Sequence, residues 1–136
     1  MAVSIPESHK HLLLDPIVVS LITVMPDGQP QATPVWVDYD GTYVIVNTAR
    51  GRQKDRNMKP GAKVTILSIN PKDDHDWLEV RGVVAEETEE GAVDVINSLS
   101  LKYRGNPDYY ATAPEQRGKQ QRVTYKIEPK RVNTGG

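Results

Sequence analysis

One stretch of sequence decides how the chain is organised: Asn47-Thr48-Ala49-Arg50-Gly51-Arg52-Gln53-Lys54-Asp55-Arg56-Asn57-Met58-Lys59-Pro60. It places five basic residues beside a single acid, although the formal net charge of the whole chain is only -1. The apolar run before it is typical of a strand, and its glycine, followed by good helix formers, predicts a turn and a short helix. A helix start exposes free backbone N–H groups and readily binds anions. The stretch therefore predicts either a phosphate-type anion site or a solvated basic surface.

Six strands are predicted around this stretch, because β-branched and alternating residues recur between turn signals. They are expected at residues 17–24, 31–39, 43–48, 62–69, 77–85 and 122–127. Asp40-Gly41 is a strong hairpin signal. Pro34 predicts that the second strand is unpaired or at an edge at that point. Hairpin-like strands with short helices between them predict a closed or nearly closed antiparallel barrel.

Two further helices are predicted. The first begins with a capping-box pattern at residues 4–7, ends near Leu14 and is expected to bury Leu12 and Leu13. The second runs from about Glu89 to Tyr103 and carries one apolar face. Residues 104–120 are expected to form a loop, and the tail at residues 135–136 is expected to fray.

Composition and length bound the class of protein. A chain of 136 residues suits a single domain, here residues 1–136. It has no Phe, so the core must rely on Val, Ile, Leu, Tyr and Trp, and the lack of Cys excludes disulfides and thiolate chemistry. Near-neutral charge argues against a general nucleic-acid binder, and the apolar runs are too short for a membrane span. Since the N-terminus shows no signal-peptide pattern, we expect a cytoplasmic protein.

Three segments carry a likeness to a known family: Thr33-Pro34-Val35-Trp36, residues 47–58, and Trp77-Leu78-Glu79-Val80-Arg81-Gly82. In this order they resemble the pyridoxamine 5'-phosphate oxidase-like (PPOX class) split β-barrel family, and more closely its branch that depends on the deazaflavin coenzyme F420. The likeness spans nearly the whole chain but does not place residues 104–120. It implies a mainly β, six-stranded antiparallel split β-barrel of the FMN-binding type. It also implies a homodimer with the cofactor in a groove between the subunits.

The resemblance also implies which residues bind the cofactor. The phosphate is expected on Arg52 and Lys54, and the ring system against the backbone of residues 33–36 and 46–48. Trp77 is expected to reach the cofactor from the partner subunit, although an aromatic residue on a strand is commonly a core residue. The implied cofactor-binding set is Arg52, Lys54, Arg50, Thr48, Asn47, Asn57, Thr33, Pro34, Val35, Trp36 and Trp77. Arg56 and Lys59 are interpreted as solvated or in contact with an anionic tail of the cofactor.

No catalytic side chain and no metal site are predicted, because hydride chemistry on a bound cofactor requires positioning rather than a nucleophile. The acids around His75 lack a spaced partner cluster and are interpreted as solvated. His9 and His11 are two positions apart, do not share a helix face, and are predicted to be surface residues. Three tyrosines either line a substrate mouth or pack the loop: Tyr103, Tyr109 and Tyr110.

The expected function is that of a reductase that passes hydride from reduced coenzyme F420 to a small unsaturated or aromatic substrate. One alternative keeps the fold and replaces the cofactor by FMN. Another is a non-catalytic protein that binds a cofactor, haem or another tetrapyrrole. The amount of positive charge distinguishes coenzyme F420 from FMN as the cofactor. The deazaflavin carries an oligoglutamate tail that Arg50, Arg56 and Lys59 could meet, whereas FMN requires fewer cations.

Overall fold

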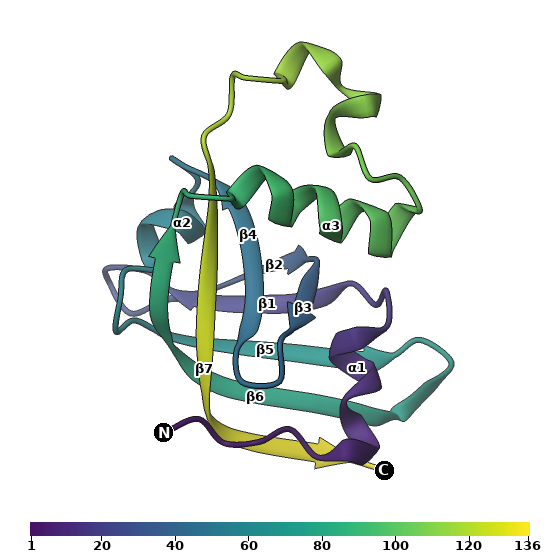
Figure 1. The fold of residues 1–136 in the computed structure, drawn as a ribbon. Helices are drawn as coiled ribbons and strands as arrows, with labels where there is room; N and C mark the ends of the chain where they lie inside the picture. The colour runs from purple at the N-terminus through teal and green to yellow at the C-terminus, as the bar shows by residue number, and fades with distance from the viewer.

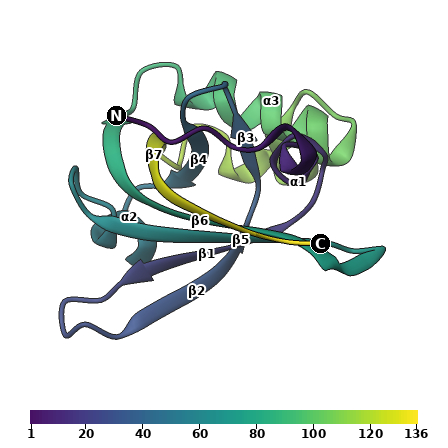
Figure 2. The same ribbon diagram turned by 90° about the horizontal axis from the view of Figure 1, so that it is seen from below.

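The computed structural model describes residues 1–136 and is built around one curled antiparallel sheet (Figure 1, Figure 2). Its strands are β1 (Val19–Val24), β2 (Pro30–Val35), β3 (Val37–Tyr39), β4 (Val44–Ala49), β5 (Lys63–Asn70), β6 (Asp73–Thr88) and β7 (Arg122–Gly135). They lie in the order β2-β1-β5-β6-β7-β4-β3. The predicted mainly β split barrel is confirmed, but the sheet has seven strands rather than six.

The additional strand arises because the predicted strand at residues 31–39 is broken at Trp36. β2 pairs only with β1, and β3 pairs only with β4, so these consecutive strands occupy opposite edges of the sheet. Val35 and Val37 are both buried, so the apolar alternation continues across the break and hides it in the sequence. Pro34 lies in the edge strand β2, as predicted, where a residue without an N–H is tolerated.

β6 and β7 form a long ladder that runs past both predicted ends. β6 begins at Asp73 rather than at residue 77, and β7 continues to Gly135 rather than ending at residue 127. The prediction of a frayed tail is wrong for Gly135, which is paired with Trp77. A Cβ on Gly135 would lie 2.0 Å from the indole nitrogen of Trp77, so only glycine leaves room for this ring.

Short helical segments cover the barrel. They are the 3-10 turn η1 (Glu7–His9), α1 (His11–Leu14), α2 (Gln53–Asn57), α3 (Ala92–Arg104), and the 3-10 turns η2 (Tyr109–Thr112) and η3 (Pro114–Gln116). α3 packs against β7 and β4, and the chain that carries η2 and η3 arches above it (Figure 1). α3 begins three residues later than predicted, after Gly91, which has a positive φ of 72°. None of the helices combines the length and apolar composition that a bilayer crossing requires.

The barrel interior is filled mainly by aliphatic side chains. Leu12 and Leu13 of α1 are fully buried, as predicted, and β5, β6 and β7 contribute Ile66, Leu78 and Ile127. In the absence of Phe, the largest fully buried side chain is Tyr125. A buried Tyr hydroxyl requires a partner, and this requirement links the core to the basic stretch.

The N-terminal segment is held to the end of the sheet by two histidines. The Nε2 atom of His9 donates a hydrogen bond of 2.8 Å to the carbonyl of Gly135, and Nε2 of His11 lies 2.6 Å from a carboxylate oxygen of Asp76. Both rings reach the same region because the helix is interrupted between η1 and α1. The prediction of a surface position is therefore wrong for His9, which is buried.

Candidate functional site

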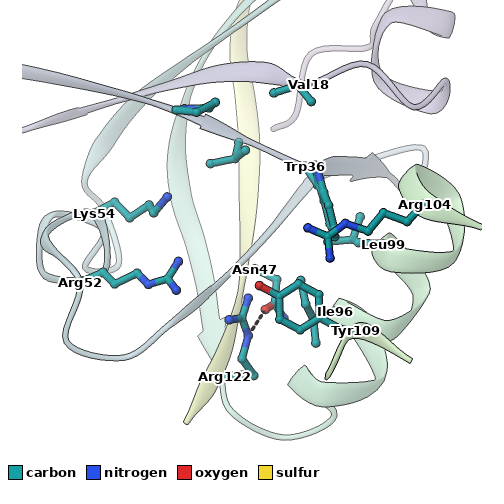
Figure 3. Close-up of a pocket in the computed structure, with 12 residues that line it drawn as sticks. Val18, Trp36, Asn47, Arg52, Lys54, Ile96, Leu99, Arg104, Tyr109 and Arg122 are labelled. Atoms are coloured by element: carbon teal, nitrogen blue, oxygen red, sulfur yellow. Dashed lines mark hydrogen bonds between the residues drawn. The ribbon is translucent and has the colours of Figure 1, made fainter. Parts of the chain in front are cut away.

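A pocket of about 260 Å³ opens between the β2–β3 junction, α2 and α3 (Figure 3). Its lining is half apolar, and its four charged residues are all cationic. The lining residues are Val18, Pro34, Val35, Trp36, Asn47, Arg52, Lys54, Ile96, Leu99, Arg104, Tyr109 and Arg122. A hollow with positive charge and no acid attracts an anionic ligand.

The turn after β4 is fixed by a buried carboxylate. Asp55 is only 4% exposed and accepts hydrogen bonds from the hydroxyl of Tyr125, from Nη1 of Arg50 at 2.9 Å and from the N–H of Gly51 at 2.9 Å. Burial alone would raise the pKa of Asp55, but these three donors outweigh burial and the pKa is lowered. Tyr125 is therefore the link between the core and this turn.

This arrangement alters the predicted anion site. α2 has five residues, and the N–H of Gly51 is already bound to Asp55. The N–H of Gly51, which precedes the helix, is therefore unavailable to an anion, and the positive charge at the pocket comes from the side chains of this segment. Arg52 and Lys54 extend from this segment into the pocket (Figure 3), and their predicted contact with a phosphate stays a prediction.

Lys54 and Arg52 have no carboxylate partner. Nζ of Lys54 donates only a long hydrogen bond of 3.3 Å, to Oγ1 of Thr33. Burial, followed by the charges of Arg52 and Arg122, lowers the pKa of Lys54. The three cations thus repel one another across the pocket, and an anion between them would relieve the repulsion.

Arg122 is a further pocket residue that the motif reading missed. It is only 2% exposed and has no carboxylate partner: Nε donates to Oδ1 of Asn47 at 3.0 Å and Nη1 donates to Oε1 of Gln120 at 3.2 Å. Its guanidinium carbon also lies 5.1 Å from the centre of the Tyr109 ring. Asn47 is held in turn by donating to the carbonyl of Ala92 at 2.8 Å. Burial lowers the pKa of Arg122. Asn47, a predicted site residue, therefore orients the arginine.

The opposite end of the pocket is aromatic. Trp36 stacks on Tyr103 with ring centroids 5.2 Å apart, and Tyr109 meets the edge of Trp36 at 5.9 Å. The guanidinium of Arg104 lies 4.6 Å from the Trp36 ring. Of the three tyrosines, only Tyr109 lines this pocket, whereas Tyr103 supports Trp36 and donates to the carbonyl of Ile17. Tyr110 is buried in the loop.

Several predicted site residues have other positions. Arg50 is occupied by carboxylates, with N···O distances of 2.9 Å to Asp55, 3.2 Å to Glu87 and 2.9 Å to Glu89. Thr48 points into the barrel with the buried side of β4, is 1% exposed, and its hydroxyl has no hydrogen-bond partner.

The remaining predicted residues also lie outside the pocket lining. Asn57 donates to Oγ1 of Thr23 at 3.0 Å, and Thr33 touches the site only through Lys54. Trp77 covers Gly135 instead of lining this pocket, so its predicted contact with a partner's cofactor stays a prediction. Near it, the possible metal ligands Asp73, Asp74 and His75 are all exposed.

The residues that the motif reading missed come from distant parts of the chain. They are Val18, Ile96, Leu99, Arg104 and Arg122. The apolar members look like ordinary strand and helix core positions, and the two arginines stand alone at element ends. Only the curl of the sheet brings them to the basic stretch.

Comparison with known proteins identifies the family. Residues 5–135 match the family described as pyridoxamine 5'-phosphate oxidase. Among solved structures, an F420 reductase shares 29% sequence identity and superposes with a TM-score of 0.79, over 95% of this chain and 98% of its own. A conserved hypothetical protein from Mycobacterium tuberculosis shares 23% identity at a TM-score of 0.71, over 98% of this chain and 86% of its own.

A putative pyridoxamine 5'-phosphate oxidase from Lactobacillus delbrueckii shows the same fold at 19% identity and a TM-score of 0.64, over 96% of this chain and 93% of its own. A search of curated proteins found no match. The match over residues 5–135 covers nearly the whole chain. The chain therefore belongs to the pyridoxamine 5'-phosphate oxidase family of oxidoreductases.

Proposed function

We propose that the protein is a reductase that binds coenzyme F420 in this pocket and transfers hydride to a small unsaturated or aromatic substrate. One observation carries the proposal: four cations and no acid line the pocket, beside an aromatic wall. An anionic cofactor with a flat ring system matches both features. The similarity to an F420 reductase at 29% identity over nearly the whole chain supports the choice of cofactor.

The phosphate belongs at the end where Arg52, Lys54 and Arg122 converge. Burial and the charges of Arg52 and Arg122 lower the pKa of Lys54, so this is the point where a negatively charged group is most favoured. Arg122 is held by Asn47 before any ligand arrives, so little ordering is required on binding. Arg52 and Lys54 are the residues that the family resemblance assigned to the phosphate.

The ring system belongs along residues 34–36, opposite Ile96 and Leu99 of α3. When bound in reduced form, the cofactor supplies the hydride. The chain orients the ring between these apolar side chains and excludes water from one face. No side chain in the pocket is assigned to a covalent step, in keeping with chemistry that depends on positioning.

The anionic tail has fewer partners than the sequence suggested. Arg50 is saturated by three carboxylates. Arg56 donates to the carbonyl of Gly51 and to Oε1 of Gln53 at 2.6 Å. Lys59 is exposed. We assign the tail to Lys59 and Arg56, where exposed contacts are worth less than about 1 kcal/mol each.

The protein is proposed to act as a homodimer, in which Trp77 of one subunit reaches the cofactor of the other. The edge strands β2 and β3 flank the pocket mouth, and the exposed apolar side chain of Val18 lies at its rim. Exposed apolar surface beside a site is often covered by a second chain.

FMN is the second candidate, favoured by the match to the pyridoxamine 5'-phosphate oxidase family. Titration of the purified protein with coenzyme F420 and with FMN, followed by absorbance and fluorescence, decides between them. We expect tighter binding of coenzyme F420, with a gap that narrows as salt rises, because part of the preference comes from exposed charges. If FMN binds as tightly as coenzyme F420 or more tightly at low salt, FMN is the cofactor of this protein.

Turnover is the second part of this test. Oxidation of the reduced coenzyme is followed with a panel of conjugated acceptors. Tight binding without oxidation of the coenzyme by any acceptor would point to a carrier protein instead of a reductase.

A further inference from the structure

Arg104 is a cation at the pocket that no acid neutralises. Its side chain makes no hydrogen bond or ion pair within the chain, in contrast to Arg50, which contacts three carboxylates, and Arg117, which lies 2.7 Å from Asp108. Asp108, four positions along the chain, is thus already engaged by Arg117. An arginine with unused donors at a pocket is available for a ligand.

Aromatic stacking holds this guanidinium in place. Its central carbon lies 4.6 Å from the ring of Trp36 and 5.8 Å from the ring of Tyr109. These contacts use no N–H group of the guanidinium, and two N–H groups in parallel are the donors that bind a carboxylate. Trp36 is fixed in turn by Tyr103 behind it.

Arg104 is separate from the phosphate end. The charges that lower the pKa of Lys54 are those of Arg52 and Arg122, and Arg104 is not among them. In Figure 3 the side chains of Arg52 and Lys54 reach in from one side, whereas Arg104 reaches in from the other, beside Trp36 and Tyr109. Arg104 therefore lies on the side of the pocket away from Arg52 and Lys54, and the ring of Tyr109 lies between Arg104 and Arg122, 5.8 Å from one guanidinium and 5.1 Å from the other.

A second hollow, of about 170 Å³, lies beyond this end of the pocket. It is lined by Arg104, Tyr109, Tyr110, Thr112, Ala113, Gln116 and Gln120. Arg104 and Tyr109 line both hollows, and neither hollow contains an acid. A ligand at Arg104 can therefore extend under the loop without meeting a negative charge.

We propose that Arg104 binds a carboxylate of the substrate, so that the favoured acceptors are flat, conjugated or aromatic acids. The conjugated part of the substrate lies beside Trp36 and Tyr109, and the carboxylate lies on the edge of the guanidinium. This inference rests on the proposed function, since it assigns the phosphate end and the apolar side chains of the pocket to the cofactor. It makes Arg104 the residue that determines specificity.

The test compares a charged probe with its neutral ester, trans-cinnamate and methyl cinnamate, which share the conjugated part. Each is titrated by calorimetry into protein saturated with oxidised coenzyme F420, where no turnover occurs. We expect cinnamate to bind about tenfold more tightly than the ester, the effect of one charge-assisted contact at a partly open site. Arg104→Gln removes this difference and leaves the affinity for the ester unchanged, whereas Arg104→Lys restores part of it.

Controls separate the possible failures. Arg81→Gln removes an exposed arginine of β6 that lies 3.2 Å from Glu79 and outside both hollows, and it should leave both probes unaffected. Equal binding of the two probes by the parent protein would overturn the proposal. So would a loss of coenzyme affinity in Arg104→Gln as large as the loss for cinnamate, because Arg104 would then serve the cofactor. If coenzyme F420 itself fails to bind, the proposed function falls, and the same titrations on ligand-free protein still decide the role of Arg104.

Discussion

Arg50 and Arg52 are two residues apart in the basic stretch, yet they serve different ends. Arg50 turns to Asp55, Glu87 and Glu89 and fastens the turn to β6, whereas Arg52 turns into the pocket and contacts no acid. Local sequence shows equal charges at both positions. Two of the three acids that bind Arg50, Glu87 and Glu89, lie more than thirty residues away in the chain.

The first prediction concerns cofactor affinity. Arg52→Ala and Lys54→Ala should each weaken binding of coenzyme F420 roughly ten- to a hundred-fold, since a charge-assisted contact is worth about 1.5–3 kcal/mol. Fluorescence titration measures the effect, and unfolding in urea should show little change in stability. If either variant binds as tightly as the parent, that residue does not hold the phosphate.

The second prediction concerns Arg50. Arg50→Ala should lower the free energy of unfolding by about 1.5–3 kcal/mol, because the buried carboxylate of Asp55 loses a charged donor. Urea unfolding followed by circular dichroism measures this. Arg56→Ala, which removes an exposed arginine of the same segment, is the matched control and should be nearly neutral. If Arg50→Ala is as stable as the parent but binds the cofactor more weakly, Arg50 contributes to cofactor binding rather than to the stability of the fold.

The third prediction is a pH dependence that originates at Asp55. Its pKa is lowered from the ordinary value of 3.8, so the folded protein favours the charged form. The resulting stability is present above pH 3.8 and is lost as pH falls through the lowered pKa. Asp55→Asn should be less stable than the parent at pH 7, and the difference should shrink at lower pH. A constant difference between pH 7 and pH 2.5 would contradict this account.

At this scale the sequence predicts the part of the site that is continuous in the chain. Arg52, Lys54 and Trp36 were found because each stands within a motif. Arg104 and Arg122 were not, because an isolated arginine at the end of a helix or the start of a strand is ordinary. Arg122 is distinguished by burial and exposed Arg104 by its aromatic neighbours, and neither has a counter-charge; a linear pattern reveals none of these features.

At the scale of elements, the hydrophobic pattern located every strand but could not divide or end all of them. The break at Trp36 escaped detection because alternation continues through it. The extension of β7 to Gly135 escaped detection because that segment gains its pairing from β6, a partner that is distant in sequence. Local composition indicates where strands lie, whereas pairing with other strands sets ends such as the start of β6 at Asp73 and the end of β7 at Gly135.

The fourth prediction tests the β6–β7 ladder at Gly82. A Cβ there would lie 2.5 Å from the backbone oxygen of Glu128, beside a shift in register. Because backbone cannot move aside easily, Gly82→Ala should lower the free energy of unfolding by about 1–3 kcal/mol. Ser20→Ala, at an exposed position of β1, is the control, and urea unfolding is the measurement. Parent-like stability of Gly82→Ala would show that the ladder can shift.

At the scale of the whole molecule, the fifth prediction is that the protein is a dimer in solution. The resemblance that located the basic stretch also implies a shared groove, and Val18 exposes apolar surface at the pocket rim. Light scattering at micromolar concentration should give twice the chain mass of 15.2 kDa. If the protein is a monomer, Trp77 of a partner cannot contact the cofactor, and the residues of a single chain must bind the cofactor alone.

The placement of β2 and β3 at opposite edges of the sheet has a consequence for how such a protein can change. No ladder of hydrogen bonds joins these strands, so the seam between them is closed by one covalent link at Trp36 and by side chains. Hydrogen bonds hold paired strands at a spacing of about 4.8 Å. The distance across the seam between β2 and β3 instead depends on the size of the side chains that fill it. Substitutions at Trp36, Val18 or Leu99 can therefore resize the mouth without breaking a backbone pair. Mutation can therefore change the shape of the pocket at this seam while the basic stretch and the turn fixed by Asp55 stay intact.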